Sequence, residues 1–332
     1  MKSILNKLFD HKRLTSEEAK EVLIQIAQSK FNSAEIAAFM TVFLMRPIAV
    51  EELRGFREAL MDLAVKIDLS DFNTIDLCGT GGDGKNTFNI STLTSFILAG
   101  ADQKVAKHGN YGVSSSSGSS NMLAHMGYNF SNDQDQLKRE LDQAGICFLH
   151  APLFHPAMKV VAPIRKELGV KTFFNMLGPL VNPARPQNQF VGVYSLEVAR
   201  AYNYMLQESG QTNYGVVYSL DGYDEISLTG NFKLLKKSGE QLLSPEDLGL
   251  NTIAPESIYG GSSVAEAAAV FKTILEGEGS LEQNNVVLAN AAMALSLVNP
   301  AMNFETAFEK AEESLLSGKA KQRLGKLIEL SN

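Results

Sequence analysis

The sequence changes its pattern near residue 73, and this change constrains the fold more than any other feature. The first 65 residues show only helical periodicity, with apolar side chains at helical spacing in 19–27 and 36–45 and a third segment at 51–65. From Asn73 onward, short apolar segments alternate with helix-like ones. This alternation is typical of a parallel α/β sheet. We therefore expect an α/β protein with a small N-terminal helical domain and a larger α/β domain that contains a mostly parallel central sheet.

The domain boundaries follow from this pattern. Strands are expected at 74–77, 104–106, 146–149, 190–194 and 214–218, and helices at 93–99, 134–144, 157–167, 197–208, 265–276 and 285–298. The proline-rich segment 173–186 is expected to be a loop that crosses from one part of the chain to another. The helical domain is expected to span 1–70, with a returning segment around 166–186, and the α/β domain to span 71–165 and 187–332.

Composition narrows the class of protein. A net charge of −7 argues against a nucleic-acid or membrane-surface partner, which would require clustered Lys and Arg. The longest apolar run, 36–45, is about half the length of a membrane span. Cys78 and Cys147 are too few for a disulfide framework, so we expect two reduced, buried thiols. These features predict a cytoplasmic enzyme that binds neither nucleic acid nor membrane.

The segment CGTGGDGKNTFNIST, residues 78–92, joins an expected strand to an expected helix. A glycine-rich connection of this kind exposes consecutive backbone N–H groups at the positive end of the helix dipole, which favours phosphate binding. Asn89, Ser91 and Thr92 fall where the helix begins, so they can cap it or bind a ligand oxygen. The segment matches neither a P-loop nor a dinucleotide fingerprint. The simpler alternative is a tight turn without a ligand.

A second candidate segment is KHGNYGVSSSSGSSNML, residues 107–123, which lies between an expected strand and a helical pattern. Its hydroxyl and N–H groups can bind phosphate, and Lys107 would add a positive charge. Alone, the serine run would be interpreted as a flexible linker. His108 alone would more often be a structural hydrogen-bonding residue than a catalytic one.

A third candidate is SLDGYDEIS, residues 219–227, which follows the expected strand at 214–218. In a loop at the carboxyl end of this strand, Asp224 and Glu225 can both turn toward a ligand crevice. Hard carboxylates next to a phosphate site favour Mg²⁺, which prefers a few protein oxygens together with substrate phosphates. An acidic surface turn is the alternative.

A fourth candidate is Arg165, in a helix that begins after His155-Pro156. An arginine can hold a carboxylate through two parallel hydrogen bonds, although a solvated helix arginine is the default interpretation. After this helix comes the stretch NMLGPLVNPARP, residues 175–186.

In this order and at these separations, GTGGD, N-S-T, KHGN, DE and NMLGPLVNPARP resemble the anthranilate phosphoribosyltransferases, and the resemblance covers the whole chain. The family transfers the phosphoribosyl group of phosphoribosyl pyrophosphate to the amino group of anthranilate, in tryptophan biosynthesis. The resemblance implies a nucleoside phosphorylase/phosphoribosyltransferase-like fold, a Mg²⁺ cofactor, and a homodimer formed by the helical domain.

The resemblance also implies roles for individual residues. Mg²⁺ would be held by Ser91, Asp224 and Glu225, and anthranilate would be oriented by Asn110 and Arg165. The full set of implied substrate-binding residues is Gly79, Gly82, Asp83, Thr87, Asn89, Ile90, Ser91, Thr92, Lys107, His108, Gly109, Asn110, Ser114, Ser115, Ser119 and Arg165. We expect no catalytic side chain, because electrostatic stabilisation of the leaving pyrophosphate and positioning of a neutral aromatic amine suffice.

The chain departs from this pattern at three positions. Many members carry Arg and Lys where Tyr111 and Ser116 stand here, and Asp where Asn121 stands, so two positive charges are missing near the expected phosphate pocket.

Two other functions fit the fold class. A pyrimidine nucleoside phosphorylase would carry a KHSTGGVGD-like loop, which this chain lacks. A non-catalytic nucleic-acid-binding relative would need a basic groove, against which the pI near 5.4 argues.

Overall fold

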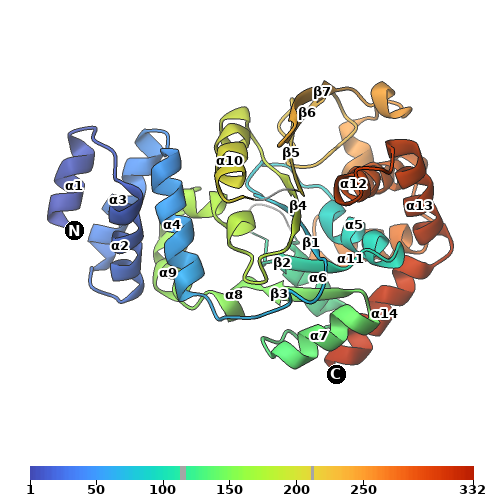
Figure 1. Ribbon diagram of the computed structural model, residues 1–332, viewed down its shortest axis with the longest axis horizontal. Coiled ribbons are helices and arrows are strands. Elements are labelled where there is room, and N and C mark those ends of the chain that lie inside the picture. The colour runs from blue at the N-terminus through green and yellow to red at the C-terminus, as the bar shows by residue number, and fades with distance from the viewer. Residues whose placement is uncertain (113–116, 211–212) are drawn as a thin grey trace. The chain divides into compact units, whose positions relative to one another are not determined.

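The computed structural model describes residues 1–112, 117–210 and 213–332, and these residues form two compact units. The first unit comprises 1–66 and 151–183, and the second comprises 67–150 and 184–332. Figure 1 labels the helices and strands of both units. The expected combination of a helical domain and an α/β domain is confirmed, and each unit is described separately below.

The first unit is helical. Its elements are α1 (Lys2–Phe9), α2 (Ser16–Ala27), α3 (Ser33–Met45), α4 (Val50–Leu63), α8 (Ala151–Phe154), α9 (Met158–Leu168) and the short 3₁₀ turns η1 (Phe173–Met176) and η2 (Gly178–Val181). Capping boxes begin α2 at Thr15 and α3 at Asn32, each closed by a glutamate three residues later. The core is aromatic: the ring of Phe173 stacks on Phe56 with a centroid separation of 4.5 Å.

The returning segment of this unit is longer than the sequence suggested. It begins at Ala151, not near 166, because α8 and α9 belong to the helical core. The Val65 N–H donates to the Phe154 carbonyl at 2.8 Å, and α9 packs against α2 and α3 through Val161 and Ile164, which are buried. The helix expected at 157–167 was therefore correctly placed along the chain but assigned to the wrong domain.

The second unit contains a seven-stranded sheet in the order β3-β2-β1-β4-β5-β6-β7. Its strands are β1 (Ile75–Gly79), β2 (Val105–Gly109), β3 (Ile146–His150), β4 (Asn188–Gly192), β5 (Asn213–Ser219), β6 (Phe232–Lys236) and β7 (Gly239–Leu243). The pairs from β3 to β5 are parallel, whereas β6 and β7 are antiparallel. This confirms the expected mostly parallel sheet.

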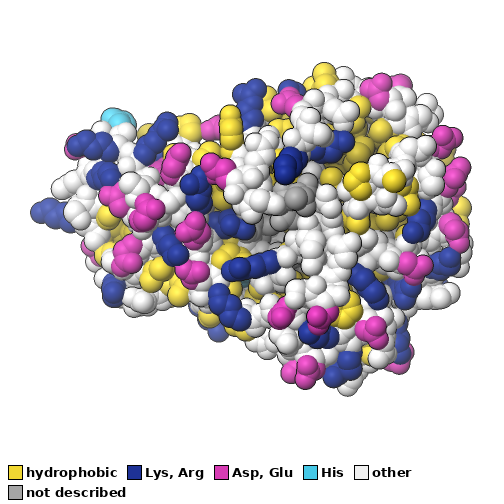
Figure 2. Space-filling view, in the orientation of Figure 1, with side chains coloured by type: hydrophobic (Ala, Val, Ile, Leu, Met, Phe, Trp, Pro, Cys, Tyr) yellow, Lys and Arg dark blue, Asp and Glu magenta, His cyan; other side chains and the backbone are white. Residues whose placement is uncertain are grey.

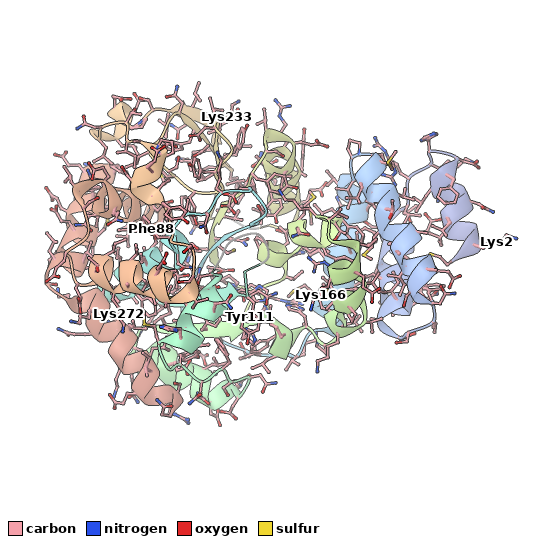
Figure 3. The ribbon with its side chains drawn as sticks, turned by 180° about the vertical axis from the view of Figure 1, so that it is seen from behind. Lys2, Phe88, Tyr111, Lys166, Lys233 and Lys272 are labelled. Atoms are coloured by element: carbon pink, nitrogen blue, oxygen red, sulfur yellow. The ribbon has the colours of Figure 1, made fainter. Side chains whose placement is uncertain are left out.

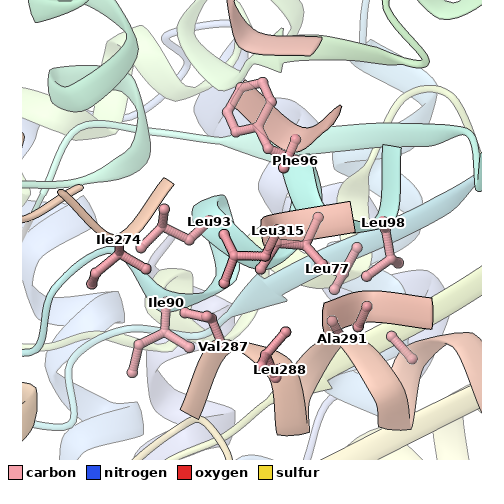
Figure 4. Close-up of a cluster of buried hydrophobic side chains, with 14 of the residues drawn as sticks. Leu77, Ile90, Leu93, Phe96, Leu98, Ile274, Val287, Leu288, Ala291 and Leu315 are labelled. Carbon is pink, nitrogen blue, oxygen red and sulfur yellow. The ribbon is translucent and has the colours of Figure 1, made fainter. Parts of the chain in front are cut away.

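Helices surround this sheet (Figure 1). They are α5 (Ile90–Gly100), α6 (Ser119–His125), α7 (Gln134–Gln143), α10 (Leu196–Glu208), α11 (Val264–Leu275), α12 (Leu281–Val298), α13 (Phe304–Leu316) and α14 (Lys319–Ser331), with the short turns η3 (Glu246–Leu248) and η4 (Pro255–Ile258). Helix α5 is the centre of the core, because nearly every residue from Ile90 to Gly100 is buried and α12, α13 and α14 all pack on it. Figure 4 shows its side chains Ile90, Leu93, Phe96 and Leu98 among Ile274, Val287, Leu288, Ala291 and Leu315.

The strand order places several loops at one edge of the sheet. The chain leaves β1 toward β2 on one side, while β4 lies on the other side of β1. In an α/β sheet, ligands bind outside the carboxyl ends of the strands at such a reversal. The loops that follow β1, β2 and β5 all emerge at this edge, and these loops contain the glycine-rich, serine-rich and acidic candidate segments.

Neither positive nor negative side chains dominate the face of the molecule shown in Figure 2. On the face shown in Figure 2, Lys and Arg side chains are interspersed with Asp and Glu side chains. Within the part of the chain that the structure describes, no helix has the length and apolarity needed to cross a membrane.

Candidate active site

The glycine loop leaves β1 at Gly79 and reaches α5 through several residues with positive φ. Gly81, Gly82 and Gly84 have φ values of +63°, +74° and +77°, which side chains with a Cβ rarely adopt. The later part of the loop is fixed: the Phe88 N–H donates to the Ile258 carbonyl at 3.1 Å, and Phe88 itself is buried (Figure 3). The loop is therefore held at both ends, with its glycines between them.

Asn89 occupies the N-cap position of α5, but its side chain does not cap the helix. Its Nδ2 instead donates to the Ser117 carbonyl at 2.9 Å, which joins the glycine loop to the serine-rich loop. Its Oδ1 is buried and has no hydrogen-bond partner among the described residues. A buried acceptor without a donor costs free energy, so this oxygen is suited to a donor on a ligand.

The acidic segment contacts the glycine loop directly. The Gly81 N–H donates to Asp224 Oδ2 at 2.7 Å. Gly79 leaves room for this carboxylate, since a Cβ built on Gly79 would lie 2.2 Å from the same oxygen. A Cβ built on Gly192, at the end of β4, would lie only 1.5 Å from the Asp224 carbonyl oxygen, so this position also requires glycine. The structure thus brings Gly79, Gly81 and Asp224 together at the reversal point of the sheet.

Glu225, Ser91 and Lys107 form the second half of this cluster. Lys107 Nζ lies 3.4 Å from Ser91 Oγ, and Ser91 and Glu225 line the same small cavity. Lys107 is 1% exposed and also donates to the Leu77 carbonyl, so its charge lies beneath the loop instead of projecting into solvent. Burial lowers the pKa of Lys107, while Asp76 and Glu225 oppose this effect.

The pKa values of both carboxylates in this cluster are raised. Burial, with the nearby Asp83 charge, raises the pKa of Asp224 to about 7. Burial and the Asp224 charge raise the pKa of Glu225 well above its usual range. A bound divalent cation would relieve both effects, and the hard oxygen donors of Ser91, Asp224 and Glu225 suit Mg²⁺.

These donors do not complete a metal cage. Among the residues that the structure describes, no group of three His, Cys, Asp or Glu side chains is arranged to hold a metal ion by itself. Mg²⁺ takes few protein oxygens and completes its coordination with water and substrate phosphates, so two carboxylates and a hydroxyl are enough protein donors for it. The donor set of the site therefore fits the expected cofactor.

The remaining residues of the two phosphate segments lie around this cluster. Gly82 and Asp83 are in the loop itself, Thr87 forms a β-bridge with Tyr259, and the Ile90 and Thr92 side chains are buried in α5. The Asp83 carboxylate accepts the Lys85 N–H at 3.1 Å. Lys85 in turn lies over the Tyr223 ring, 4.5 Å from its centroid. These contacts link the loop to the acidic segment a second time.

The serine-rich loop is closed by Asn121. The Asn121 Oδ1 accepts the N–H of Gly112 at 2.8 Å and that of Gly118 at 3.0 Å. An aspartate at this position could accept the same two hydrogen bonds. The asparagine found here therefore keeps both of these contacts. Ser114, Ser115 and Ser116 lie outside the described residues. Ser119 begins α6, with its Oγ 3.4 Å from the Asn110 carbonyl.

His108, Gly109 and Tyr111 lie at the end of β2 and just beyond it. The His108 N–H donates to Asp76 Oδ1 at 3.1 Å, and Gly109 lacks space for a Cβ against Ser119 and Phe148. Tyr111 is 47% exposed and packs edge-on against His150 at 5.0 Å between ring centroids (Figure 3). Tyr111 thus places a hydroxylated ring at the position where many members of the family that the sequence resembles carry an arginine.

Arg165 belongs to α9 of the helical unit. Its Nη2 donates to Asn175 Oδ1 at 3.2 Å, and its guanidinium lies 5.5 Å from the centroid of Phe174. Burial lowers the pKa of Arg165 from its usual value, which is so high that the group stays cationic. These contacts orient the fork of Arg165 within its own unit and leave further donors for a ligand.

Sequence reasoning missed one residue of the α/β unit, Asn290 of α12. Its Oδ1 accepts the Ile226 N–H at 3.1 Å, and its Nδ2 donates to the Ile226 carbonyl at 2.9 Å. Asn290 is 1% exposed and fixes the backbone immediately after Glu225. The sequence did contain a signal for this role, because Asn290 is a polar residue within the apolar run VVLANAAMAL, residues 286–295, and a buried polar side chain is expected to form hydrogen bonds.

The chain is similar to known proteins in both sequence and fold. Residues 71–321 match the family described as "Glycosyl transferase family, a/b domain", and residues 2–64 match its helical bundle domain. The chain is 60% identical over 331 residues to the anthranilate phosphoribosyltransferase of Flavobacterium psychrophilum, covering 100% of both chains.

Two solved structures share the whole fold. The anthranilate phosphoribosyltransferase of Thermus thermophilus superposes with a TM-score of 0.90 at 30% identity, covering 98% of each chain. The Saccharomyces cerevisiae enzyme in complex with phosphoribosyl pyrophosphate and Mg superposes with a TM-score of 0.90 at 27% identity, covering 99% of this chain and 97% of that one. The family matches and the fold thus define a two-domain glycosyltransferase. Within that class, the chain belongs to the anthranilate phosphoribosyltransferase family.

Proposed function

We propose that this chain transfers the phosphoribosyl group from phosphoribosyl pyrophosphate to the amino group of anthranilate. The products are N-(5-phosphoribosyl)anthranilate and pyrophosphate, and the reaction is a step of tryptophan biosynthesis. The observation that carries the proposal is the meeting of the glycine loop with the carboxylate pair, in which the Gly81 N–H and the space at Gly79 hold Asp224 at the reversal point of the sheet.

The pyrophosphate is assigned to the glycine loop and the serine-rich loop. Backbone N–H groups of the loop and the N-terminus of α5 stabilise negative charge, and Lys107 adds a buried positive charge beneath them. The Asn89 Oδ1 has no donor among the described residues and is available to a ribose hydroxyl. We assign the same site to Gly82, Asp83, Thr87, Ser91, Thr92 and Ser119.

Mg²⁺ is the proposed cofactor, held by Ser91, Asp224 and Glu225. When bound, it neutralises charge on the pyrophosphate as that group departs. Asp224 is positioned by the Gly81 N–H, and Glu225 by the Asn290 contacts with the neighbouring Ile226. These residues therefore form a fixed set of oxygen donors before substrate arrives.

The chain needs no covalent intermediate for this reaction. The bond between C1 of the ribose and the pyrophosphate oxygen breaks while the bond from C1 to the anthranilate nitrogen forms, and the amine proton passes to solvent. An aromatic amine is neutral at pH 7, so positioning replaces a strong general base. Arg165 is assigned to the anthranilate carboxylate and Asn110 to the orientation of the ring. Electrostatic stabilisation of the leaving group supplies the remaining acceleration.

A homodimer and a cytoplasmic location belong to the same proposal. The helical unit exposes apolar side chains at Phe9, Leu44 and Met45, of which Met45 is 83% exposed, and these side chains are available for contact with a second copy of the chain. Cys78 and Cys147 are both free thiols, as expected in a reducing compartment. Light scattering that gives the mass of one chain at micromolar concentration would contradict the dimer.

The activity is tested by following anthranilate fluorescence in a mixture of the purified chain, phosphoribosyl pyrophosphate and Mg²⁺. The fluorescence should fall, and mass spectrometry should detect the phosphoribosylated product. Omitting either phosphoribosyl pyrophosphate or Mg²⁺ should abolish the change. A folded protein that leaves the fluorescence constant under the complete conditions would refute the proposed function.

A further inference from the structure

A second cavity lies in the α/β unit at the edge of the sheet opposite the candidate active site. Its volume is about 400 Å³, within the usual range for small-molecule pockets. It is lined by the beginning of β5 and by the end of β6, which run antiparallel to each other, together with the carboxyl-terminal half of α12. Asp224 and Glu225 follow the other end of β5, so this cavity is separate from the proposed magnesium site.

The floor of this cavity is apolar. Phe190 of β4 and Leu234 of β6 come from neighbouring parts of the sheet, and Leu297 comes from α12. Gly215 of β5 lies between Phe190 and Leu234, and a Cβ on it would come within 3.1 Å of the Phe190 ring. The Cβ would also lie 3.3 Å from Leu234, so Gly215 lets the Phe190 and Leu234 side chains close over the strand and form a continuous apolar floor, which can accept a flat or branched apolar group.

The rim of the cavity is cationic. Lys236 and Lys237 form its edge at the turn between β6 and β7. Within the described ranges, neither lysine side chain forms an ion pair or a hydrogen bond, whereas Lys233 on the same strand pairs with Glu240. Lys236 and Lys237 are adjacent in the sequence and carry two positive charges. They provide a place for an anion.

The helix dipole orients such a ligand. Helix α12 ends at Val298, and its carboxyl end carries partial negative charge that disfavours an anionic group next to Leu297. The anionic group therefore belongs at the lysine rim, and the apolar body belongs on the floor. This polarity excludes a ligand with an anionic group at both ends.

We propose that this cavity is a second binding site, for a small amphipathic monocarboxylate. The carboxylate lies at Lys236 and Lys237, and the ring or branched aliphatic body lies against Phe190, Leu234 and Leu297. The ligand class is defined by these contacts and does not depend on the activity proposed above.

Indole-3-propionate is a suitable probe, because the chain contains no Trp and excitation of the indole reports on the probe alone. Its fluorescence anisotropy should rise on titration with the full chain. Two Lys→Gln substitutions, Lys236→Gln together with Lys237→Gln, should weaken binding about tenfold or more, since each removes a charge-assisted contact. Lys233→Gln, on the same strand (Figure 3), should leave binding unchanged. On the unmodified chain, indole-3-propionamide should bind about tenfold more weakly than the acid.

Two further readouts locate the probe. The double lysine variant should keep its melting temperature and its kcat/KM, because both lysines lie outside the candidate active site. Arg165→Ala should bind the probe as the unmodified chain does. No rise in anisotropy, equal binding of acid and amide, or binding that survives in the double lysine variant and disappears in Arg165→Ala would each overturn the proposal.

Discussion

Gly79→Ala tests whether the position of Asp224 controls the reaction. The new Cβ would lie 2.2 Å from Asp224 Oδ2 and 2.8 Å from its Cγ, closer than real Cβ contacts allow. Relief of this overlap requires the carboxylate to retreat by roughly 1 Å, which also breaks its 2.7 Å bond with the Gly81 N–H. The backbone of Gly79 has no positive φ, so the substitution acts through this contact and not through backbone strain.

The substitution is expected to lower both the activity and the free energy of unfolding. A displacement of about 1 Å in an active site costs about 10²-fold in rate. Loss of the Gly81 hydrogen bond and overpacking together cost about 2–4 kcal/mol of the free energy of unfolding. We expect kcat/KM for phosphoribosyl pyrophosphate to fall about 10²-fold, with a higher Mg²⁺ concentration at half-maximal rate. Both quantities follow from anthranilate fluorescence at varied Mg²⁺.

Gly325→Ala is the matched control, because Gly325 lies in α14 of the same unit and a Cβ there meets nothing within 4 Å. It should keep full activity and gain up to about 1 kcal/mol of stability. If Gly79→Ala stays folded and keeps kcat/KM within twofold of the unmodified chain, the contact with Asp224 does not matter for the reaction, and the assigned geometry is wrong.

Three further perturbations address other parts of the account. Arg165→Ala should raise KM for anthranilate about 10-fold to 100-fold and leave KM for phosphoribosyl pyrophosphate nearly unchanged, while Lys166→Ala on the exposed side of α9 should change neither; equal effects on both substrates would make Arg165 structural. Asn290→Leu should raise the Mg²⁺ requirement and lower the melting temperature, because the Ile226 N–H and carbonyl lose their partner, and an unchanged Mg²⁺ titration would count against a positioning role. Burial raises the pKa of Glu140 to about 7, above its unfolded value, so stability should fall by up to about 3 kcal/mol between pH 4.5 and 7 and then level off; Glu140→Gln should flatten this slope in urea unfolding, and a slope equal to that of the unmodified chain would refute the assignment.

The sequence was sufficient to predict the parallel strands, because each of them is a short apolar run that is buried on both faces and bounded by turn residues. It was not sufficient for the β6–β7 hairpin, in which FKLLKKSGEQLL has a weak alternation and many lysines. The lower boundary of the returning segment was also wrong, since nothing in the local pattern of 151–165 says that Val161 and Ile164 pack on α2 and α3.

The candidate site likewise has a part that the sequence predicted and a part that it did not. The glycine spacing predicted a loop at a helix start, and the positive φ values of Gly81 and Gly82 agree with that prediction. The burial of Lys107 and the hydrogen bonds of Asn290 with the Ile226 backbone depend on contacts between residues far apart in the sequence. Periodicity and motif spacing do not encode such contacts, because they arise only when the sheet and α12 pack together.

The most direct test of the central claim is a Mg²⁺ titration of phosphoribosyl pyrophosphate binding by calorimetry, with the unmodified chain and with the pair Asp224→Asn and Glu225→Gln. The claim is that these two carboxylates bring Mg²⁺ to the pyrophosphate. The account predicts that binding by the unmodified chain strengthens with Mg²⁺, and that the double variant, with an unchanged fold by circular dichroism, loses this dependence. If the double variant responds to Mg²⁺ as the unmodified chain does, the metal is held elsewhere and the account is contradicted.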